Sequence, residues 1–496
     1  MVLSHFWSIN IFLLESNGTD EGELNLPNLA DYDITYRTYT EPENSDTIFS
    51  INNEGEGGLE IESREFSDSM YILTINNLEP NEFYQISAFV KVDYLEEQDS
   101  EYGVNIGENG SWVSSTQITE SRENWERIEV VIRSGEEGII NLNLRIGFWG
   151  NHTKGKAIFD DIMIEKITDN SDTKKIIESD CGNIRVVLDR NEYEMSGITE
   201  EKAKKWVNTL SLVKDCYKDL VGKHAYNGKI DIITGNYYGA YAIAGDPIQW
   251  LGKSQSTELR SIEQDDDWLF GILHEIGHNY DLNDMWNFDA EVLANFKMAY
   301  VLEKLNGKVI MNYEYTYVGA EIKQHYKKVY DESGLQEIDG VIYKLIDIKD
   351  KITEQTNIDG WDAYKKVFRY FNDLDSKDVP SSDSSGKIKL YLDKLSDYSG
   401  INIRDMFSEV EWAQLEDRYG EIEDDDVNRE DTEKEEVTEE EKVDDEKEEV
   451  KQDNTIAKDK IPNTGLNITT VIMIMGLIIN SIILFIGYKI IKRNGV

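Results

Sequence analysis

The feature that most constrains this chain is a pair of histidines four residues apart. His274 and His278 belong to an HExxH motif, in a chain that contains only 6 histidines. Residues i and i+4 share one face of an α-helix, so the two imidazoles can converge on one ion if this segment is helical. The motif therefore predicts a helix that carries a metal site.

The residues around the motif favour such a helix. Asp265, Asp266 and Asp267 offer side-chain oxygens that can cap its start. An apolar stripe at helical spacing follows, made of Trp268, Leu269, Ile272, Leu273 and Ile276. We expect the stripe to bury the helix. The alternative, a helix whose histidines are ordinary polar groups, is disfavoured by the complete motif.

The chemistry of the motif points to one catalytic Zn²⁺. Zinc accepts histidine nitrogens at about 2.0–2.1 Å and keeps an open position in catalytic sites. Glu275 lies about 100° round the helix from His274 and flanks that position. There it can accept a proton from water that the metal has made acidic. We predict His274 and His278 as ligands and Glu275 as general base.

A third protein ligand is needed, and a carboxylate is expected because no further histidine follows at metzincin spacing. Asp289 can cap a helix that runs from about Ala290 to Leu305. Glu291 would then lie in the first turn of this helix, where a carboxylate is favoured by the helix dipole. Asp281 and Asp284 are the rival ligands, although both more readily satisfy the turn.

These residues resemble the enhancin-like, mucin-degrading zinc metallopeptidases, which are gluzincins. The resemblance rests on His-Glu-Ile-Gly-His-Asn-Tyr from His274, on Trp286, on Glu291-Val292-x-x-Asn295, and on the segment 241–248. It covers about 181–416. It implies zinc ligation by His274, His278 and Glu291, catalysis by Glu275, and glycoprotein substrates such as mucins. Asp246 departs from the aromatic or small residue usual in this family.

Three further residues of these segments are candidates for substrate binding, namely Tyr241, Trp286 and Asn295. A tyrosine of the stretch 237–241 is a candidate hydrogen-bond donor to the oxyanion of a tetrahedral intermediate. Which tyrosine does so stays open, and packing is the commoner role for any one of them.

Residues 17–168 are predicted to form a β-sandwich of the jelly-roll type. Segments 71–75, 84–92, 128–132 and 140–146 alternate apolar with polar residues between turn-rich stretches. The run from Trp125 through Gly147-Phe148-Trp149 to 157–162 resembles jelly-roll carbohydrate-binding modules. Trp112 and Trp149 are candidates for stacking on sugar rings, with a core role as the alternative. Asp160 and Asp161 are weak candidates for a structural Ca²⁺ site.

Residues 181–420 are predicted to form the α+β gluzincin-type peptidase domain, after a polar linker at 167–180. The strand 184–188, a helix capped by Thr199, the strand 229–234 and the metal-bearing helix follow in the expected order. The part after Lys308 is expected to be mostly helical, with helices at 363–374 and 388–395.

Composition excludes some partners. The net charge of −47 argues against nucleic acid, whose phosphates would be repelled. The chain has only 2 cysteines, Cys181 and Cys216, which either pair or stay as free thiols. We expect a monomer.

The end of the chain predicts display on a cell surface. Residues 421–460 form a run of acidic residues too polar to bury a core, as in a disordered stalk. An apolar span at 468–488 is long enough to be a transmembrane helix, and a basic tail follows it. Preceded by Ile461-Pro-Asn-Thr-Gly465, the span resembles the Leu-Pro-x-Thr-Gly signal of Gram-positive sortases. This implies cleavage between Thr464 and Gly465 and attachment to peptidoglycan; a retained membrane anchor is the alternative.

The start of the chain contains an apolar run at 9–14 with no Lys or Arg before it, which makes residues 1–16 a poor secretory signal. We expect a decayed signal or one further upstream. The sequence as a whole predicts an exported, wall-anchored zinc peptidase that cleaves O-glycosylated, mucin-type proteins. A glycan-binding adhesin and a peptidase for unglycosylated proteins are the alternatives.

Overall fold

The computed structural model describes residues 21–24, 26–52, 58–97, 102–235, 241–281, 287–374 and 383–422. All of them belong to one compact unit, residues 6–423. The predicted secretory segment, the stalk beyond residue 422, the sorting signal and Trp286 lie outside the described residues. Within the described ranges, no helix is long and apolar enough to cross a membrane.

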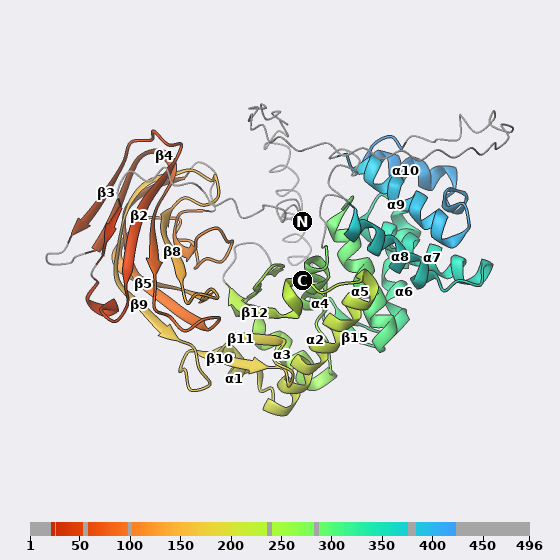
Figure 1. Ribbon diagram of the computed structural model, residues 1–496, viewed down its shortest axis with the longest axis horizontal. Coiled ribbons are helices and arrows are strands. Elements are labelled where there is room, and N and C mark those ends of the chain that lie inside the picture. The colour runs from red at the N-terminus through yellow and green to blue at the C-terminus, as the bar shows by residue number, and fades with distance from the viewer. Residues whose placement is uncertain are drawn as a thin grey trace, which may run out of the picture. The chain divides into compact units, whose positions relative to one another are not determined.

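The N-terminal part is rich in β-structure, as the alternating segments predicted. Its strands, drawn from red to yellow in Figure 1, pair in antiparallel fashion. They are β1 (Glu21–Glu23), β2 (Ile34–Glu41), β3 (Thr47–Asn52), β4 (Gly58–Ile75), β5 (Phe83–Glu97), β6 (Val104–Glu108), β7 (Arg122–Arg133), β8 (Ile140–Ile146) and β9 (Thr153–Lys166).

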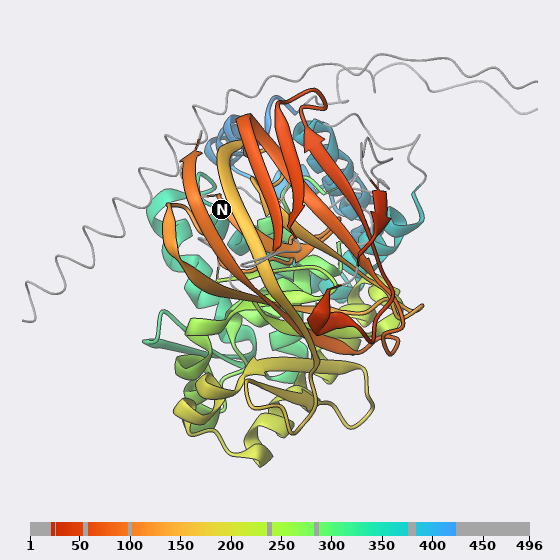
Figure 2. The same cartoon turned by 90° about the vertical axis from the view of Figure 1, so that its left-hand side faces the viewer.

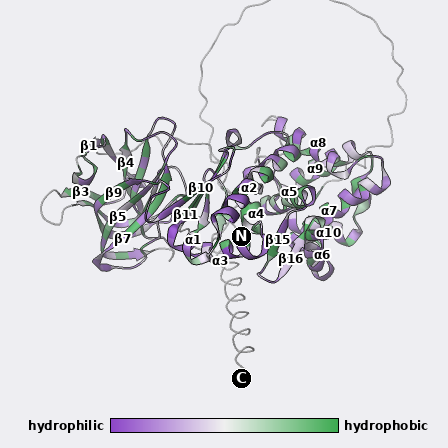
Figure 3. Ribbon diagram, turned by 90° about the horizontal axis from the view of Figure 1, so that it is seen from below, coloured by the Kyte–Doolittle hydropathy of each residue, from purple (hydrophilic) through white to green (hydrophobic). Residues whose placement is uncertain are grey.

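The long strand β4 belongs to two sets of paired strands. Its first half lies between β3 and β9, and β9 continues to β5 and β7. Its second half lies between β2 and β8, and these continue to β1 and β6. The pairing with β9 shifts register between Ser63 and Ser67, where one set gives way to the other. Figure 2 shows these strands from the side, and Figure 3 shows polar and apolar stretches along them, as expected for strands with one face in a core.

The segment predicted as a linker contains a strand. Lys174–Glu178 form β10, which pairs in antiparallel fashion with β11 (Ile184–Asp189). The sheet of the second domain therefore begins before residue 181. Its order is β10-β11-β12-β14-β13, with β12 at Ile230–Gly235, β13 at Ala242–Ile243 and β14 at Ile248–Leu251. The strands β11, β12 and β14 are parallel, and helix α2 (Glu200–Val221) connects the first two.

The two faces of this sheet pack against different partners. Val186, Ile232 and Trp250 face the helices and belong to the core of the second domain. Val187 and Ile233, which alternate with them, belong instead to the apolar core of the N-terminal β-rich part. The N-terminal β-strands and the second sheet thus share a buried apolar contact.

Helices make up most of the second domain, as predicted (Figure 1). Thr199 caps α2 by accepting a hydrogen bond from the backbone N–H of Lys202. The others are α1 (Arg190–Ser196), α3 (Gln255–Asp265), α4 (Phe270–Asn279), α5 (Ala290–Leu305), α6 (Ile322–Ser333), α7 (Ile338–Gln355), α8 (Gly360–Asp373), α9 (Ser384–Ser399) and α10 (Glu409–Tyr419). An unpredicted hairpin, β15 (Lys308–Met311) with β16 (Tyr315–Val318), follows α5.

The predicted start of the metal-bearing helix needs a correction. The acidic run does not cap α4, because α3 occupies the chain up to Asp265 and α4 begins at Phe270. Asp267 instead accepts hydrogen bonds from the backbone N–H groups of Leu269 and Ile310. It therefore joins the approach to α4 with the β15 strand. Leu269 has a φ of 64°, which marks the sharp entry into the helix.

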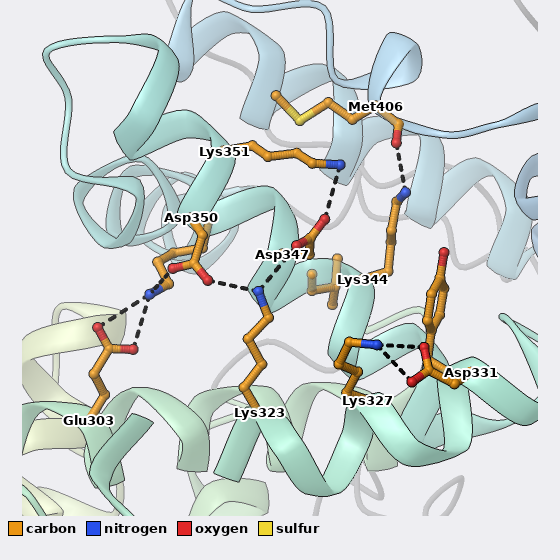
Figure 4. Close-up of polar contacts among 12 residues, drawn as sticks. Glu303, Lys323, Lys327, Asp331, Lys344, Asp347, Asp350, Lys351 and Met406 are labelled. Atoms are coloured by element: carbon orange, nitrogen blue, oxygen red, sulfur yellow. Dashed lines mark hydrogen bonds and ion pairs between the residues drawn. The ribbon is translucent and has the colours of Figure 1, made fainter. Parts of the chain in front are cut away.

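Partly or fully buried lysines link the C-terminal helices through ion pairs and hydrogen bonds (Figure 4). Lys323 on α6 reaches Asp347 and Asp350 on α7 at 3.1 and 2.8 Å. Lys344 on α7 donates to Glu411 on α10 and to the carbonyl oxygen of Met406. Because these charges are paired, the helices that support α5 and α10 can pack closely.

Candidate metal centre

Helix α4 presents its histidines at the edge of the core. Ile272, Leu273 and Ile276 are fully buried, which fixes the rotation of the helix. A Cβ atom on Gly277 would lie 2.9 Å from the carbonyl oxygen of Ala294, so only glycine lets α4 and α5 approach this closely. The close approach brings the start of α5 beside the two histidines.

Helix α5 begins where the sequence predicted. The Asp289 side chain accepts a hydrogen bond from the backbone N–H of Val292, 3.2 Å away. Its second oxygen accepts hydrogen bonds from the Arg418 guanidinium, 3.1 Å away, and from the Tyr419 hydroxyl, 2.9 Å away. Both residues lie in the last turn of α10. Asp289 therefore ties the first turn of α5, which carries Glu291, both to its own helix and to α10.

Three donor groups converge as predicted. The Nε2 atoms of His274 and His278 lie 3.0 Å apart. Oxygens of Glu291 lie 3.2 Å from the first of these nitrogens and 3.6 Å from the second. Two ligands of a tetrahedral zinc ion lie about 3.3 Å apart when each is about 2.0–2.1 Å from the metal. The spacing therefore fits one zinc ion. Within the described residues this is also the only cluster of three metal-binding side chains.

Further side chains orient both imidazoles. Nδ1 of His274 lies 2.9 Å from Oδ1 of Asn295, so Nδ1 carries the proton and Nε2 is free to bind a metal. Nδ1 of His278 lies 3.7 Å from Asp281, which also accepts from the fully buried Lys297. Asp281 thus contacts the Nδ1 side of His278 and Lys297, and it does not belong to the cluster of three donor groups. Such contacts fix the ring orientation of metal-binding histidines.

The general-base candidate is buried next to the donors. Glu275 is only 9% exposed, and burial raises the pKa of its carboxyl group. The histidines and a hydrogen bond from the backbone N–H of Ala244 partly offset this effect. A raised pKa makes a glutamate a better proton acceptor, as a general base must be.

The electrostatics of the cluster favour a positive charge between the carboxylates. Burial opposes the charged form of His274, but Glu291 and Glu275 outweigh it and raise its pKa to about 9. Burial also opposes charge on Glu291, yet the histidines lower its pKa to about 2. The two carboxylates therefore favour positive charge at this position, as a cation-binding site requires.

The other predicted site residues are not all at the metal centre. The hydroxyl of Tyr241 donates to Glu258 at 2.6 Å, and Oδ1 of Asn295 lies 2.9 Å from Nδ1 of His274. Substrate binding by these two residues stays a prediction. Trp112 and Trp149 lie in the N-terminal β-rich part, and their rings stack with centroids 5.5 Å apart. Trp286, Asp284, Thr464 and Gly465 lie outside the described residues.

Two smaller predictions can also be placed. Asp160 and Asp161 belong to no metal-binding cluster within the described residues, so calcium has no support there. Cys181 is exposed and Cys216 is buried, and both are free thiols.

Sequence reasoning missed two contacts of this site. Lys297 is completely buried. Its place inside an apolar run of α5 was the sequence signal that it needs a buried partner. Asn279 donates to the carbonyl oxygen of Gly245 and accepts from its N–H, at 2.9 and 2.7 Å. The only sequence signal for the contact with Gly245 was the position of Asn279 directly after the motif.

Comparison with known proteins agrees with the geometry. Residues 190–411 match the model of the peptidase M60 family, enhancin and enhancin-like. This match supports a peptidase. A TRPM8 channel-associated factor homolog from the zebrafish Danio rerio is 26% identical over 219 residues, which are 43% of this chain and 23% of that protein. The chain thus matches about a quarter of the length of this relative.

Solved structures give weaker likenesses. A conserved protein of unknown function from Bacillus anthracis covers 71% of this chain and 70% of its own, with 13% identity and a TM-score of 0.38. A family 11 carbohydrate-binding module from Clostridium thermocellum covers 29% of this chain and 95% of its own, with 13% identity and a TM-score of 0.20. At these scores neither likeness carries an argument.

Proposed function

We propose that this chain is a zinc metallopeptidase that hydrolyses peptide bonds in O-glycosylated, mucin-type glycoproteins. The observation that carries the proposal is the convergence of His274, His278 and Glu291, with the buried Glu275 next to them. The match of residues 190–411 to the peptidase M60 family supports the same reaction class.

The mechanism assigns a role to each of these side chains. His274, His278 and Glu291 would hold the zinc ion, which supplies Lewis acidity for polarising a peptide carbonyl and for making water more acidic. Glu275 accepts a proton from the attacking water and passes it to the amine that leaves. Its raised pKa suits it to both steps. Asn295 and Asp281 keep the imidazoles in the orientation that directs Nε2 toward the shared centre.

Glycoproteins are the preferred substrate class because a second domain accompanies the peptidase. The N-terminal part carries the stacked, partly exposed pair Trp112 and Trp149, and aromatic rings are the groups on which sugars stack. The family match supports glycoprotein substrates as well. We further propose that the chain is displayed on a Gram-positive cell wall after cleavage between Thr464 and Gly465, as its terminal sequence indicates.

The test of substrate class is mass spectrometry of a mucin-type peptide incubated with the purified chain. The same peptide without its O-glycans serves as the matched substrate, and Glu275→Gln serves as the matched enzyme. The proposal expects cleavage beside glycosylated Ser or Thr, little cleavage of the bare peptide, and none by the variant. Equal cleavage of both peptides would favour a general peptidase. Binding to the glycopeptide without cleavage would favour an adhesin.

A further inference from the structure

One side chain of the sandwich reaches into the peptidase domain. Arg133, the last residue of β7, forms a bidentate ion pair with Asp246, with nitrogen–oxygen distances of 2.9 and 2.8 Å. A paired guanidinium and carboxylate of this geometry fixes direction as well as distance. Arg133 and Asp246 are both partly buried, with side-chain exposures of 23% and 22%. The pair is therefore better shielded from solvent than an ordinary surface ion pair.

The Arg133 guanidinium also belongs to a larger charge network. It donates to Asp231 on β12, whose side chain is only 3% exposed. Arg185 on β11 donates to the same carboxylate at 2.9 and 2.8 Å and to the backbone oxygen of Asn81, in the sandwich. Two arginines and two aspartates thus balance their charges where Val187 and Ile233 already join the two domains. This network gives Arg133 one fixed position.

Asp246 follows directly on a segment that is bonded to the metal-bearing helix. Gly245 exchanges two hydrogen bonds with the side chain of Asn279, one residue after His278. The backbone N–H of Ala244 donates to the carboxylate of Glu275. Holding Asp246 therefore holds the backbone that faces the general base.

We propose that Arg133 is a positioning residue for the peptidase reaction. Acting through Asp246, it fixes Ala244 and Gly245 beside Glu275, so the sandwich forms part of the active-site support in addition to any glycan binding. This inference deepens the proposed function and rests on it for its kinetic consequence. Its structural consequence, a backbone segment ordered by the sandwich, does not need any enzyme activity.

The structural consequence is tested by hydrogen exchange in the full chain. Arg133→Gln keeps a side chain that can donate hydrogen bonds but loses the charge. Asp246→Asn breaks the same pair from the other side and serves if the first variant folds poorly. Arg122→Gln is the matched control. Arg122 lies on the same strand, and among the described residues its ion pairs are with Glu120 and Glu126, both in the N-terminal domain.

We expect the backbone amides of residues 242–246, 248 and 249 to exchange about tenfold faster in both test variants and at the wild-type rate in the control. Unchanged exchange in both test variants would overturn the inference. If the wild-type chain cleaves no peptide, the proposed function is refuted. Faster exchange in the two test variants would still establish that Arg133 orders the segment 242–249.

The kinetic consequence is tested on a substrate that the wild type cleaves. We expect kcat to fall about tenfold in Arg133→Gln with KM nearly unchanged, because the general base is misplaced while the other groups of the site keep their places. Zinc content should stay stoichiometric. The double variant with Asp246→Asn should be no slower than either single variant, as expected for two residues that act as one pair. Normal kcat in Arg133→Gln, or additive losses in the double variant, would overturn the positioning role.

Discussion

Nδ1 of His274 lies 2.9 Å from Oδ1 of Asn295, one helical turn beyond Glu291 on α5. Residues i and i+4 share a helix face, so a single face of α5 supplies one ligand and orients another. Helix α4 supplies the two histidines and the general base. The candidate metal centre is therefore a contact between two helices, and we expect their separation to control the metal affinity.

Removing the acceptor behind His274 should weaken metal binding. Asn295→Ala leaves the imidazole free to rotate and to change tautomer, and we expect a loss of about 10- to 100-fold in zinc affinity. Competition with a chelator measures this directly. Asn295→Asp keeps an acceptor and should lose less. Asn208→Ala, whose side chain contacts Asp180 on a distant surface, should bind zinc as the wild type does. Unaltered affinity in Asn295→Ala would refute the orienting role.

Breaking the buried ion pair behind His278 should destabilise the fold. Lys297→Met leaves Asp281 as a buried carboxylate without its cation, and we expect a loss of about 3–5 kcal/mol in the free energy of unfolding. Denaturant titration of the metal-free chain measures it. Lys304→Met changes an exposed lysine on the same helix and should cost under about 0.5 kcal/mol. Equal losses in the two variants would contradict the account.

Gly277 should be intolerant of any side chain. In Gly277→Ala the new Cβ would lie 2.9 Å from the carbonyl oxygen of Ala294, so α4 and α5 must separate. We expect about 1–3 kcal/mol of destabilisation from this overpacking, together with weaker zinc binding because Glu291 moves away from the histidines. Calorimetric unfolding and zinc titration check the two effects. A variant that binds zinc normally would show that the helix separation does not control the site.

Glu258 should make stability depend on pH. Burial raises its pKa to about 7, although Tyr241 and Trp250 donate to its carboxylate. The unfolded chain has the lower, ordinary pKa, so the folded state binds more protons between the two values. The free energy of unfolding therefore falls as pH rises toward 7.

Replacing Glu258 by the neutral Gln removes this contribution and keeps an oxygen for both donors. The drop in stability between pH 5 and pH 8 should then shrink by up to about 3 kcal/mol. Parallel urea titrations of wild type and Glu258→Gln at the two pH values test this. An identical drop in both proteins would mean that Glu258 does not carry the effect.

Local patterns predicted which residues meet at the candidate metal centre. The 3.6-residue period placed His274 and His278 on one helix face, and the capping oxygen of Asp289 gave the observed start of α5 and hence the place of Glu291. Helix propensity and capping act over a few residues, so their signals can be read along the chain.

Pairings between distant segments could not be predicted in this way. Arg133 and Asp246 are 113 residues apart, and neither residue stands in a repeating pattern. The strand β10 was missed because its short, lysine-rich sequence becomes a strand only beside β11. The pattern around Glu291 drew attention to Asn295, but its partner depended on the packing of α4 against α5.

The measurement that tests the central claim most directly compares zinc content and turnover in wild type and Glu275→Gln. Glu275 takes no part in holding the metal in this account, so both proteins should contain one zinc ion per chain. Only the wild type should cleave the mucin-type glycopeptide, with a loss in the variant of at least about 10²-fold. A zinc-loaded variant that retains wild-type turnover would contradict the assignment of Glu275 and the mechanism built on it.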